Sequence, residues 1–318
     1  MKKLGNLKWA PRWVSHMGCL RGCLDYLGLD ISDGWLYGGT GHAFVINIHP
    51  QSCPSGPTAW KTMMLFELAP NLGYHLDGVF GFKGNGFAEL QEKAWDFTRK
   101  AIDKDLPLYG WELQAPEFYV LNGYDEVGYY YSGAGAEDGK GPKPWRELGD
   151  TGIGLIEVYS VETNPPQEPA MVVKESIQKV LKHASNHPDI ILEGYASGIK
   201  GYDLWIQGLE GGKAGRFGMG YNAAVWAECR SFAVAFLEEA SQRLGGQATA
   251  LFEEALGHYR AVAKNLGLLT KVYPFENMDE KILIEPDTHC QAGVGFIRAA
   301  RDAEEAGLAA LEKIAASL

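Results

Sequence analysis

Glu117 carries a carboxylate at the entry to a predicted β-hairpin. Functional side chains are often found at such a position, where the chain enters a strand. Residues 118–121 read as the first strand, 125–128 as a turn that ends in glycine, and 129–131 as the return strand. Aromatic and β-branched residues around such a turn favour a hairpin. Beside a histidine, a carboxylate can hold a polar ligand or take part in acid–base chemistry. We therefore expect Glu117 to belong to a functional site.

A second group of candidates opens a predicted helix near the N-terminus, in the run SHMGCLRGCLDYLG. Ser15 is expected to cap this helix, and Gly28 fits its end. His16 and Cys19 lie in its first turns, about one helical turn apart. The positive end of the helix dipole can favour a thiolate at Cys19. One face of the helix is predicted to be buried, because residues recur at helical spacing: Leu20, Cys23, Leu24 and Leu27.

These residues support two kinds of site. In the first, Cys19 is a nucleophile and His16 or His42 is its base, because catalysis by cysteine needs a thiolate. Glu117 cannot activate that thiol, since a nearby carboxylate disfavours the anion. In the second, His16 and Glu117 form a charge-assisted pair that binds a polar ligand or runs acid–base chemistry without a nucleophile. Each site also has a purely structural interpretation. In the first, Cys19 and Cys23 are small core residues, and in the second, His16 and Glu117 form an ion pair that fills the site.

The order of predicted elements indicates two domains of different character. The chain of 318 residues changes near VETNPPQEP, where prolines interrupt helix and strand alike. Before this point a helix, a strand, a helix, a strand, the hairpin and a further strand follow one another, which suits an α+β domain with one sheet. After it the chain is nearly all helical. We expect an α+β domain at residues 1–164 and an α-helical bundle at residues 165–318.

Three runs of the first half occur in the order of a known fold. The first helix contains CLRGCLDYLG, a buried strand contains LPLYGWEL, and the hairpin opens with EFYVLNGYD. Over roughly residues 10–163 this pattern resembles the papain-like fold of the bacteriocin-processing cysteine peptidases, and more closely the N-terminal domain of butirosin biosynthesis protein H. The helical half resembles the region that follows such domains in uncharacterised bacterial proteins, through GYDLWIQGLE and YNAAVWAECR. The resemblance implies a papain-like first domain.

The resemblance also implies a catalytic triad, and the chain departs from it at every member. The nucleophilic cysteine of the family falls on Ser15 or His16, its histidine falls on Glu117, and its orienting residue falls near Ser132. We therefore expect a ligand-binding protein or a degenerate enzyme that holds a polar small molecule, or a peptide or acyl group, in its cleft. The alternative is a cysteine-dependent acyltransferase or amide hydrolase that uses Cys19. For that alternative, the resemblance implies transfer of an acyl group from a carrier thioester to an amine.

The candidate ligand-binding residues come from both halves of the chain. Trp111 lies in the run LPLYGWEL, and the 9 Trp and 15 Tyr residues suggest a pocket with aromatic walls. His42 lies at the edge of the glycine-rich run GGTGHAF, from which it can swing inward. Asn222 lies near the start of a helix, as a cap or a lid contact. The candidate catalytic residues are Cys19, His16 and Glu117, and the candidate ligand-binding residues are Ser15, His16, His42, Trp111, Glu117 and Asn222.

No motif in the sequence predicts a metal or an organic cofactor. His183 and His187 have the spacing of a zinc half-site, but no third ligand is specified nearby. A solvated helix end is therefore the simpler interpretation of this pair. The glycine-rich runs GGTGHAF and GFKGNGFAEL match neither a P-loop nor a dinucleotide fingerprint. We interpret both runs as loops and expect no cofactor.

Charge and cysteine content limit the partners and the compartment. The formal net charge of -11 argues against nucleic acid and anionic membranes as partners, because their phosphates would be repelled. No apolar run predicts a signal peptide or a membrane-spanning helix. Five scattered cysteines favour reduced thiols and a cytoplasmic setting. We expect a small molecule or an acyl or peptidyl substrate, with a carrier protein as a candidate partner, and the oligomeric state stays open.

Overall fold

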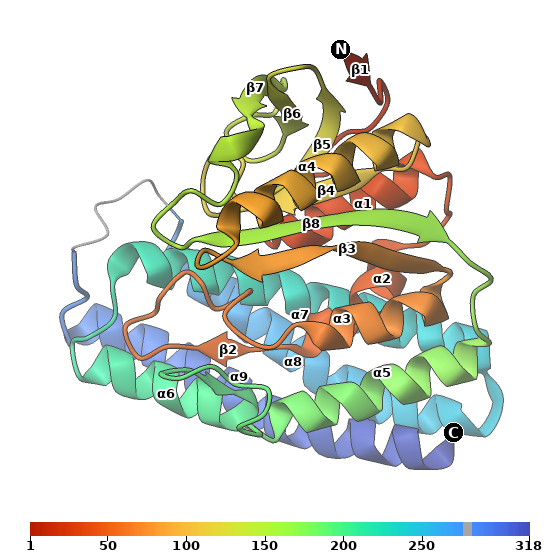
Figure 1. Ribbon diagram of the computed structural model, residues 1–318. Coiled ribbons are helices and arrows are strands. Elements are labelled where there is room, and N and C mark those ends of the chain that lie inside the picture. Colours follow the sequence, from red (N-terminus) through yellow and green to blue (C-terminus); the bar gives the residue numbers. More distant parts are fainter. Residues whose placement is uncertain (276–281) are drawn as a thin grey trace. The chain divides into compact units, whose positions relative to one another are not determined.

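The computed structural model describes residues 1–275 and 282–318 (Figure 1). It confirms the predicted α+β class. An antiparallel sheet with packed helices lies toward the N-terminus of the chain, and a helical bundle lies toward the C-terminus. Among the described residues, no helix combines the length and the apolar character that crossing a bilayer requires.

The contacts of the chain divide it into two compact units, and each unit is assembled from two segments. The sheet unit comprises Met1–Ile31 and Gly73–Pro165, and the helical unit comprises Ser32–Leu72 and Pro166–Leu318. This division differs from a single boundary at residue 164 in one respect. The segment Ser32–Leu72 groups with the helices, although it lies in the first quarter of the sequence.

The sheet unit is built on a seven-stranded sheet with the order β3-β8-β4-β5-β6-β7, in which β1 also pairs with β5. Every pair of neighbouring strands is antiparallel. The strands are β1 (Lys2–Lys3), β3 (Tyr74–Phe82), β4 (Leu108–Trp111), β5 (Phe118–Tyr124), β6 (Gly128–Ser132), β7 (Lys140–Pro144) and β8 (Leu155–Thr163). The unit also contains α1 (Ser15–Tyr26), α4 (Phe87–Asp103) and the short helix η3 (Trp145–Glu147).

The two faces of this sheet carry different helices. Side chains alternate between the faces along each strand, so the strand residues that a helix contacts show which face it covers. Helix α1 packs on the face that carries Tyr109, through the ring of His16. Helix α4 packs on the opposite face, where Trp95 contacts the rings of Tyr124 and Tyr129. The sheet unit therefore has a core on each side of the sheet, and α1 defines the face on which the sequence placed its candidate residues.

The predicted hairpin is present, and it consists of β5, a tight turn and β6. The carboxylate of Asp125 accepts hydrogen bonds from the backbone N–H groups of Val127 (2.8 Å) and Gly128 (3.1 Å), which closes the turn. Strand β3 is not among the predicted elements. Its glycines hide the pattern: a Cβ atom at Gly78 would lie 2.3 Å from the carbonyl oxygen of Val158, so only glycine fits against β8 there.

The helical unit is a bundle in which α7, α8 and α9 run alongside one another (Figure 1). Its longer helices are α5 (Pro169–Ala184), α6 (Gly198–Glu210), α7 (Arg216–Leu244), α8 (Thr249–Val272) and α9 (Thr288–Ser317). Shorter elements complete it, namely α2 (Asp33–Gly39), η1 (His42–Phe44), β2 (Asn47–Ile48), α3 (Met63–Leu68), η2 (Ala69–Leu72), β9 (Ala196–Ser197) and η4 (Gly246–Ala248). Large buried rings fill the core, among them Trp205, Trp226, Phe236, Phe252 and Tyr259.

The interpretation of GGTGHAF as a loop is wrong for most of its length. Its first two glycines end α2, and residues 42–44 form η1. A Cβ atom at Gly38 would lie 1.9 Å from Cγ of Phe236, so glycine allows α2 to pack closely on α7. These glycines serve helix packing, and the pattern of the sequence alone does not distinguish that function from a flexible loop.

A buried ion pair connects α7, α9 and the early segment of the helical unit. The Nε atom of Arg230 donates to Glu304 Oε2 (2.7 Å) and its Nη2 atom donates to Oε1 (3.0 Å). Its Nη1 atom donates to the carbonyl oxygens of Ala43 and Val45, both at 2.9 Å. The side chains of the two charged residues are 0% and 1% exposed. Arg230 thus holds the segment after α2 against the bundle, which explains why this segment belongs to the helical unit.

Two histidines are buried in the same core. His42 and His183 are 1% and 2% exposed, and the indole ring of Trp60 contacts both imidazoles. Burial, with a smaller contribution from the charge of Arg230, lowers the pKa of His42 to about 4 and that of His183 to about 4. At neutral pH both rings are therefore uncharged.

We expect the change Glu304→Gln to lower the free energy of unfolding by about 3 kcal/mol or more, because it leaves Arg230 buried without its counter-charge. The control is Glu210→Gln, which breaks an exposed pair with Arg298 and is expected to cost less than about 1 kcal/mol. The double change Arg230→Met with Glu304→Leu should recover part of the loss. Urea unfolding measures all three. Equal losses in Glu304→Gln and Glu210→Gln would contradict this account of the buried pair.

We expect stability to fall as the pH is lowered from about 6.5 toward about 4, by up to roughly 3 kcal/mol for each buried histidine. The pKa values of His42 and His183 are depressed in the folded state, so the unfolded chain takes up protons first as the pH falls. Above pH 6.5 both states hold neutral rings and this contribution is constant. In urea unfolding across this window, His42→Gln and His183→Gln should each flatten the dependence on pH. The exposed-site control His75→Gln should leave it unchanged, and a slope unaltered in all three variants would contradict the assignment.

Candidate functional site

The hydroxyl of Ser15 joins the start of α1 to the entry of the hairpin. It donates a hydrogen bond to Glu117 Oε2, and it accepts one from the backbone N–H of Phe118 (3.0 Å). The cap of α1 is Val14, whose side chain makes no capping bond. The prediction that Ser15 caps its own helix is therefore wrong, because the strand supplies both partners of the hydroxyl. The structure does bring Ser15 and Glu117 together, as two of the candidate ligand-binding residues.

His16 lies beside this contact, in an aromatic environment. It is 5% exposed, and its ring lies edge-on to the rings of Tyr109 and Phe118, with centroids 5.2 Å and 5.0 Å away. Its Nε2 atom is 3.4 Å from the hydroxyl oxygen of Tyr109. The side chain is thus held by β4 and β5 together, next to the residue that precedes β5. This environment orients the imidazole and leaves little of it in contact with solvent.

Cys19 is carried into the core by the same helix. The residue is 0% exposed, and Cys23 one turn later is equally buried. Burial raises the pKa of Cys19 well above its ordinary value, and the neighbouring Cys23 and the Glu117 carboxylate raise it further. The effect of the carboxylate has the expected sign, since two negative charges would repel. At neutral pH Cys19 is a thiol, so its environment is that of a core residue and not that of an activated nucleophile.

Trp111 is the last residue of β4, and its ring lies beside that of Phe118, with centroids 5.0 Å apart. It is 7% exposed, and its indole nitrogen has no hydrogen-bond acceptor within the described part of the chain. The next residue, Glu112, has a positive φ of 57°, and its backbone N–H donates to the carbonyl oxygen of Glu117 (2.8 Å). Residues 112–117 therefore form a closed turn that carries Trp111 at one end and Glu117 at the other.

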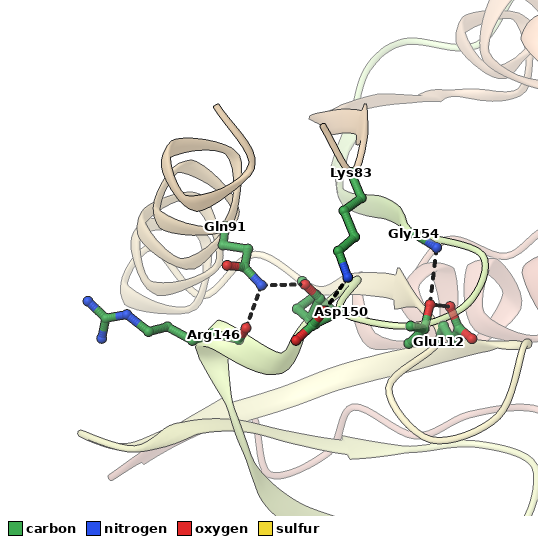
Figure 2. A network of polar contacts seen from close by, with 8 residues as sticks. Lys83, Gln91, Glu112, Arg146, Asp150 and Gly154 are labelled. Atoms are coloured by element: carbon green, nitrogen blue, oxygen red, sulfur yellow. Dashed lines mark hydrogen bonds and ion pairs between the residues drawn. The ribbon is translucent and has the colours of Figure 1, made fainter. Parts of the chain in front are cut away.

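A network of polar contacts holds this turn from the other side (Figure 2). Glu112 Oε2 accepts a hydrogen bond from the hydroxyl of Thr151 (2.8 Å), which in turn accepts one from the N–H of Gly154 (3.2 Å). Asp150 of the loop that carries Thr151 and Gly154 forms an ion pair (2.5 Å) with Lys83, which directly follows β3, although both side chains are about half exposed. Glu112 therefore supports the turn at residues 112–117, and its left-handed backbone is held by residues that are distant in sequence.

Helix α4 fixes the loop that carries Asp150 and Thr151. The side-chain amide of Gln91 donates to the carbonyl oxygens of Arg146 and Leu148, the latter at 2.9 Å (Figure 2). Gln91 is 6% exposed, so these bonds are formed away from solvent. Neither Gln91 nor the loop carries a motif that predicts this function, and only the fold brings them together.

Glu157 is a further carboxylate of the sheet unit, in the middle of β8. Burial raises its pKa to about 7, although the hydroxyl of Tyr159 forms a hydrogen bond that acts in the opposite direction. Glu157 pairs with Phe80 of β3 in the strand register. The sequence contained a signal for this residue, since a single carboxylate in the apolar run LIEVYSV is expected to be partly buried. Glu157 is therefore a carboxylate of the sheet unit in addition to the predicted candidates.

His42 lies in the helical unit, where it is part of the core. Its ring packs against Tyr37, with centroids 6.0 Å apart, and its Nδ1 atom is 3.7 Å from the Sγ atom of Cys229. The interpretation of His42 as a loop residue that can swing inward is therefore wrong. The residue belongs to a helical segment, η1, that Arg230 holds through the carbonyl groups of Ala43 within the segment and of Val45 directly after it.

Asn222 also lies in the helical unit, on the second turn of α7. Its amide nitrogen donates to the carbonyl oxygens of Ser52 (3.2 Å), Cys53 (3.0 Å) and Gly218 (2.8 Å). Its amide oxygen accepts a hydrogen bond from the indole nitrogen of Trp226 (3.1 Å). The side chain is 0% exposed. These contacts favour a structural function, in which Asn222 holds the loop around Cys53 against the helix.

The two histidines with zinc half-site spacing do not share a helix. Helix α5 ends at Ala184, so His183 lies in its last turn and His187 lies beyond it. His183 is buried, and the interpretation of this pair as a solvated helix end is wrong for that residue. Among the described residues, no group of three or more His, Cys, Asp or Glu side chains is arranged to hold a metal ion.

We expect iodoacetamide to label Cys53 first and Cys19 last. All five cysteines lie in the described part of the chain, and Cys53 is the one that is not buried. Mass spectrometry of peptides after brief treatment near neutral pH would measure each site, and a Cys53→Ser variant is the control for its signal. Rapid alkylation of Cys19 in the folded protein would contradict the raised pKa and the burial described above.

No protein-family model matches this chain, and no curated protein matches it. The resemblance to papain-like proteins therefore depends on the quoted runs of sequence. The site that the structure brings together consists of Ser15, His16, Trp111 and Glu117 in the sheet unit, with Cys19 buried beneath it.

Proposed function

We propose that the sheet unit binds a ligand and has no cysteine chemistry, as a degenerate enzyme on a papain-like scaffold that resembles the N-terminal domain of butirosin biosynthesis protein H. The observation that supports this proposal most directly is the environment of the Cys19 thiol. Its thiol is fully buried, and burial together with Cys23 and Glu117 raises its pKa well above the ordinary value. A nucleophile needs exposure and a lowered pKa, and Cys19 has neither.

The groups at the start of α1 suit recognition of a polar ligand better than turnover. The Glu117 carboxylate is partly exposed, and the hydroxyl of Ser15 holds one of its oxygens in place. The hydroxyl is a poor nucleophile here, because a carboxylate is a weak base toward an alcohol. The rings of His16, Trp111 and Phe118 pack against one another beneath this carboxylate, so its surroundings are apolar. We therefore propose a polar small molecule, or a peptide or acyl group, as the ligand.

The alternative proposal is an acyltransferase or amide hydrolase that uses Cys19, with a carrier protein as the source of the acyl group. It would require a rearrangement that exposes the thiol and moves it away from Glu117. The alternative is therefore the weaker of the two. For both, the scattered and unpaired cysteines favour a reducing compartment such as the cytoplasm, in which structural disulfides are rare.

We expect Glu117→Gln to weaken ligand binding by about tenfold, because a neutral amide replaces a charged acceptor. Saturation-transfer NMR against the full chain would test a panel of primary amines, dipeptides and N-acetylated amino acids. The matched control is Glu126→Gln, which changes an exposed carboxylate at the tip of the same hairpin and should leave binding unchanged. Binding that is equal in both variants, or a panel in which nothing binds the unaltered protein, would contradict the proposed function.

A further inference from the structure

The indole N–H of Trp111 is a buried hydrogen-bond donor without an acceptor. The residue is 7% exposed, and the described part of the chain offers its nitrogen no partner. Nearly all buried polar groups in folded proteins are hydrogen-bonded, so an unpaired donor calls for an explanation. Trp111 also lies at the candidate site, one closed turn away from Glu117. A ligand acceptor atom would satisfy the donor.

The strand register places a carboxyl group beside this donor. Gly110 of β4 pairs with Val158 of β8, so the next residues along the two strands, Trp111 and Glu157, are neighbours on one face of the sheet. It is the face that carries Tyr109 and α1, because side chains two residues apart on a strand share a face. Phe118 on β5 flanks Trp111 on the far side. The side chains of Trp111 and Glu157 therefore start from neighbouring positions on this face, and no hydrogen bond joins them in the described structure.

Aromatic side chains border this pair. Phe80 pairs with Glu157 across the β3–β8 register. Phe80 and Phe82 are 57% and 64% exposed, and their rings lie edge-on with centroids 5.4 Å apart. Large exposed rings beside the buried Trp111 and the half-buried Glu157 form a surface that suits an apolar group attached to a flat polar group.

We propose that Trp111 and Glu157 bind an amide group of the ligand, whose carbonyl oxygen accepts from the indole N–H and whose N–H donates to the Glu157 carboxyl group. An aromatic or other apolar substituent of the amide then contacts Phe80 or Phe82, whose rings are exposed. This inference rests on the proposed binding function and names its ligand class. It also gives the buried donor an acceptor that the described residues do not supply.

The chemistry of the pair favours an amide over a charged ligand. An ammonium group has no acceptor for the indole N–H. A carboxylate ligand would meet the carboxyl group of Glu157, whose pKa of about 7 leaves it partly ionised at neutral pH, in a protein with a net charge of -11. An amide offers one acceptor and one donor, and a carboxyl group accepts from its N–H in either protonation state.

Three isosteric probes test this inference: 3-phenylpropionamide, 3-phenylpropionate and 3-phenylpropylamine. The full chain, labelled with nitrogen-15, would be titrated with each probe, and the indole signals followed, with the Trp111 signal identified from Trp111→Phe. We expect the amide to move the Trp111 signal and to bind at least about tenfold tighter than the other two probes. Trp111→Phe keeps an aromatic ring and removes the donor, so it should weaken binding of the amide by about tenfold.

Two further variants separate the donor from general effects on the fold. Trp145→Phe removes the indole N–H of another tryptophan of the sheet unit and should leave binding of the amide unchanged. Glu157→Gln retains an acceptor and should bind the amide within about threefold of the unaltered protein, whereas Glu157→Leu should weaken it. The circular dichroism spectrum of each variant confirms that it is folded before binding is compared.

The outcomes distinguish this inference from the proposed function. If the Trp111 signal does not respond to the amide, or if Trp111→Phe binds it as the unaltered protein does, the inference is overturned. If 3-phenylpropylamine binds instead and Glu117→Gln abolishes its binding, the proposed function stands and the amide class is wrong. If the amide binds with all the expected losses, both are supported.

Discussion

A single hydroxyl group determines the chemical character of the sheet unit. Ser15 donates to the Glu117 carboxylate and accepts from the backbone of Phe118, so it connects the first turn of α1 to the first residue of β5. These two hydrogen bonds fix the position of the first turn of α1 against β5. Its next residue, His16, is held against the rings of β4 and β5, and Cys19 one turn later is carried into the core. The raised pKa of the thiol is a consequence of this docking, since burial is its largest cause.

The polar groups of this unit lie among aromatic rings, and this arrangement suits recognition. Glu117, Glu112 and Glu157 surround Trp111 along the chain and across the sheet, but each carboxyl group is placed by a different contact. A site that holds fixed donors and acceptors on a rigid sheet can select a ligand without reacting with it, because selectivity needs orientation and catalysis needs in addition a group activated for the reaction.

The helical unit depends on another polar contact, and this one is fully buried. The guanidinium group of Arg230 donates to Glu304 of α9, to the carbonyl oxygen of Ala43 within η1 and to that of Val45 directly after it. Burial by itself lowers the pKa of this guanidinium, but the Glu304 carboxylate more than reverses the effect, so the group stays charged. The same contact holds the segment with His42 in the core. That histidine is therefore a neutral packing residue, although its glycine-rich surroundings suggest a loop.

The sequence by itself determined the features that depend on neighbours along the chain. The α+β class, the hairpin and the amphipathic helices follow from periodicities of two and about 3.6 residues, which act within one element. The tertiary structure alone decided which groups are paired and which are buried. Ser15 forms a hydrogen bond with a strand about a hundred residues away, and Arg230 holds the segment after α2. Trp111 has no acceptor among residues 1–275 and 282–318, although Glu157 is its neighbour across the sheet. Such contacts join residues that are distant in sequence, and local periodicity carries no information about a partner on another element.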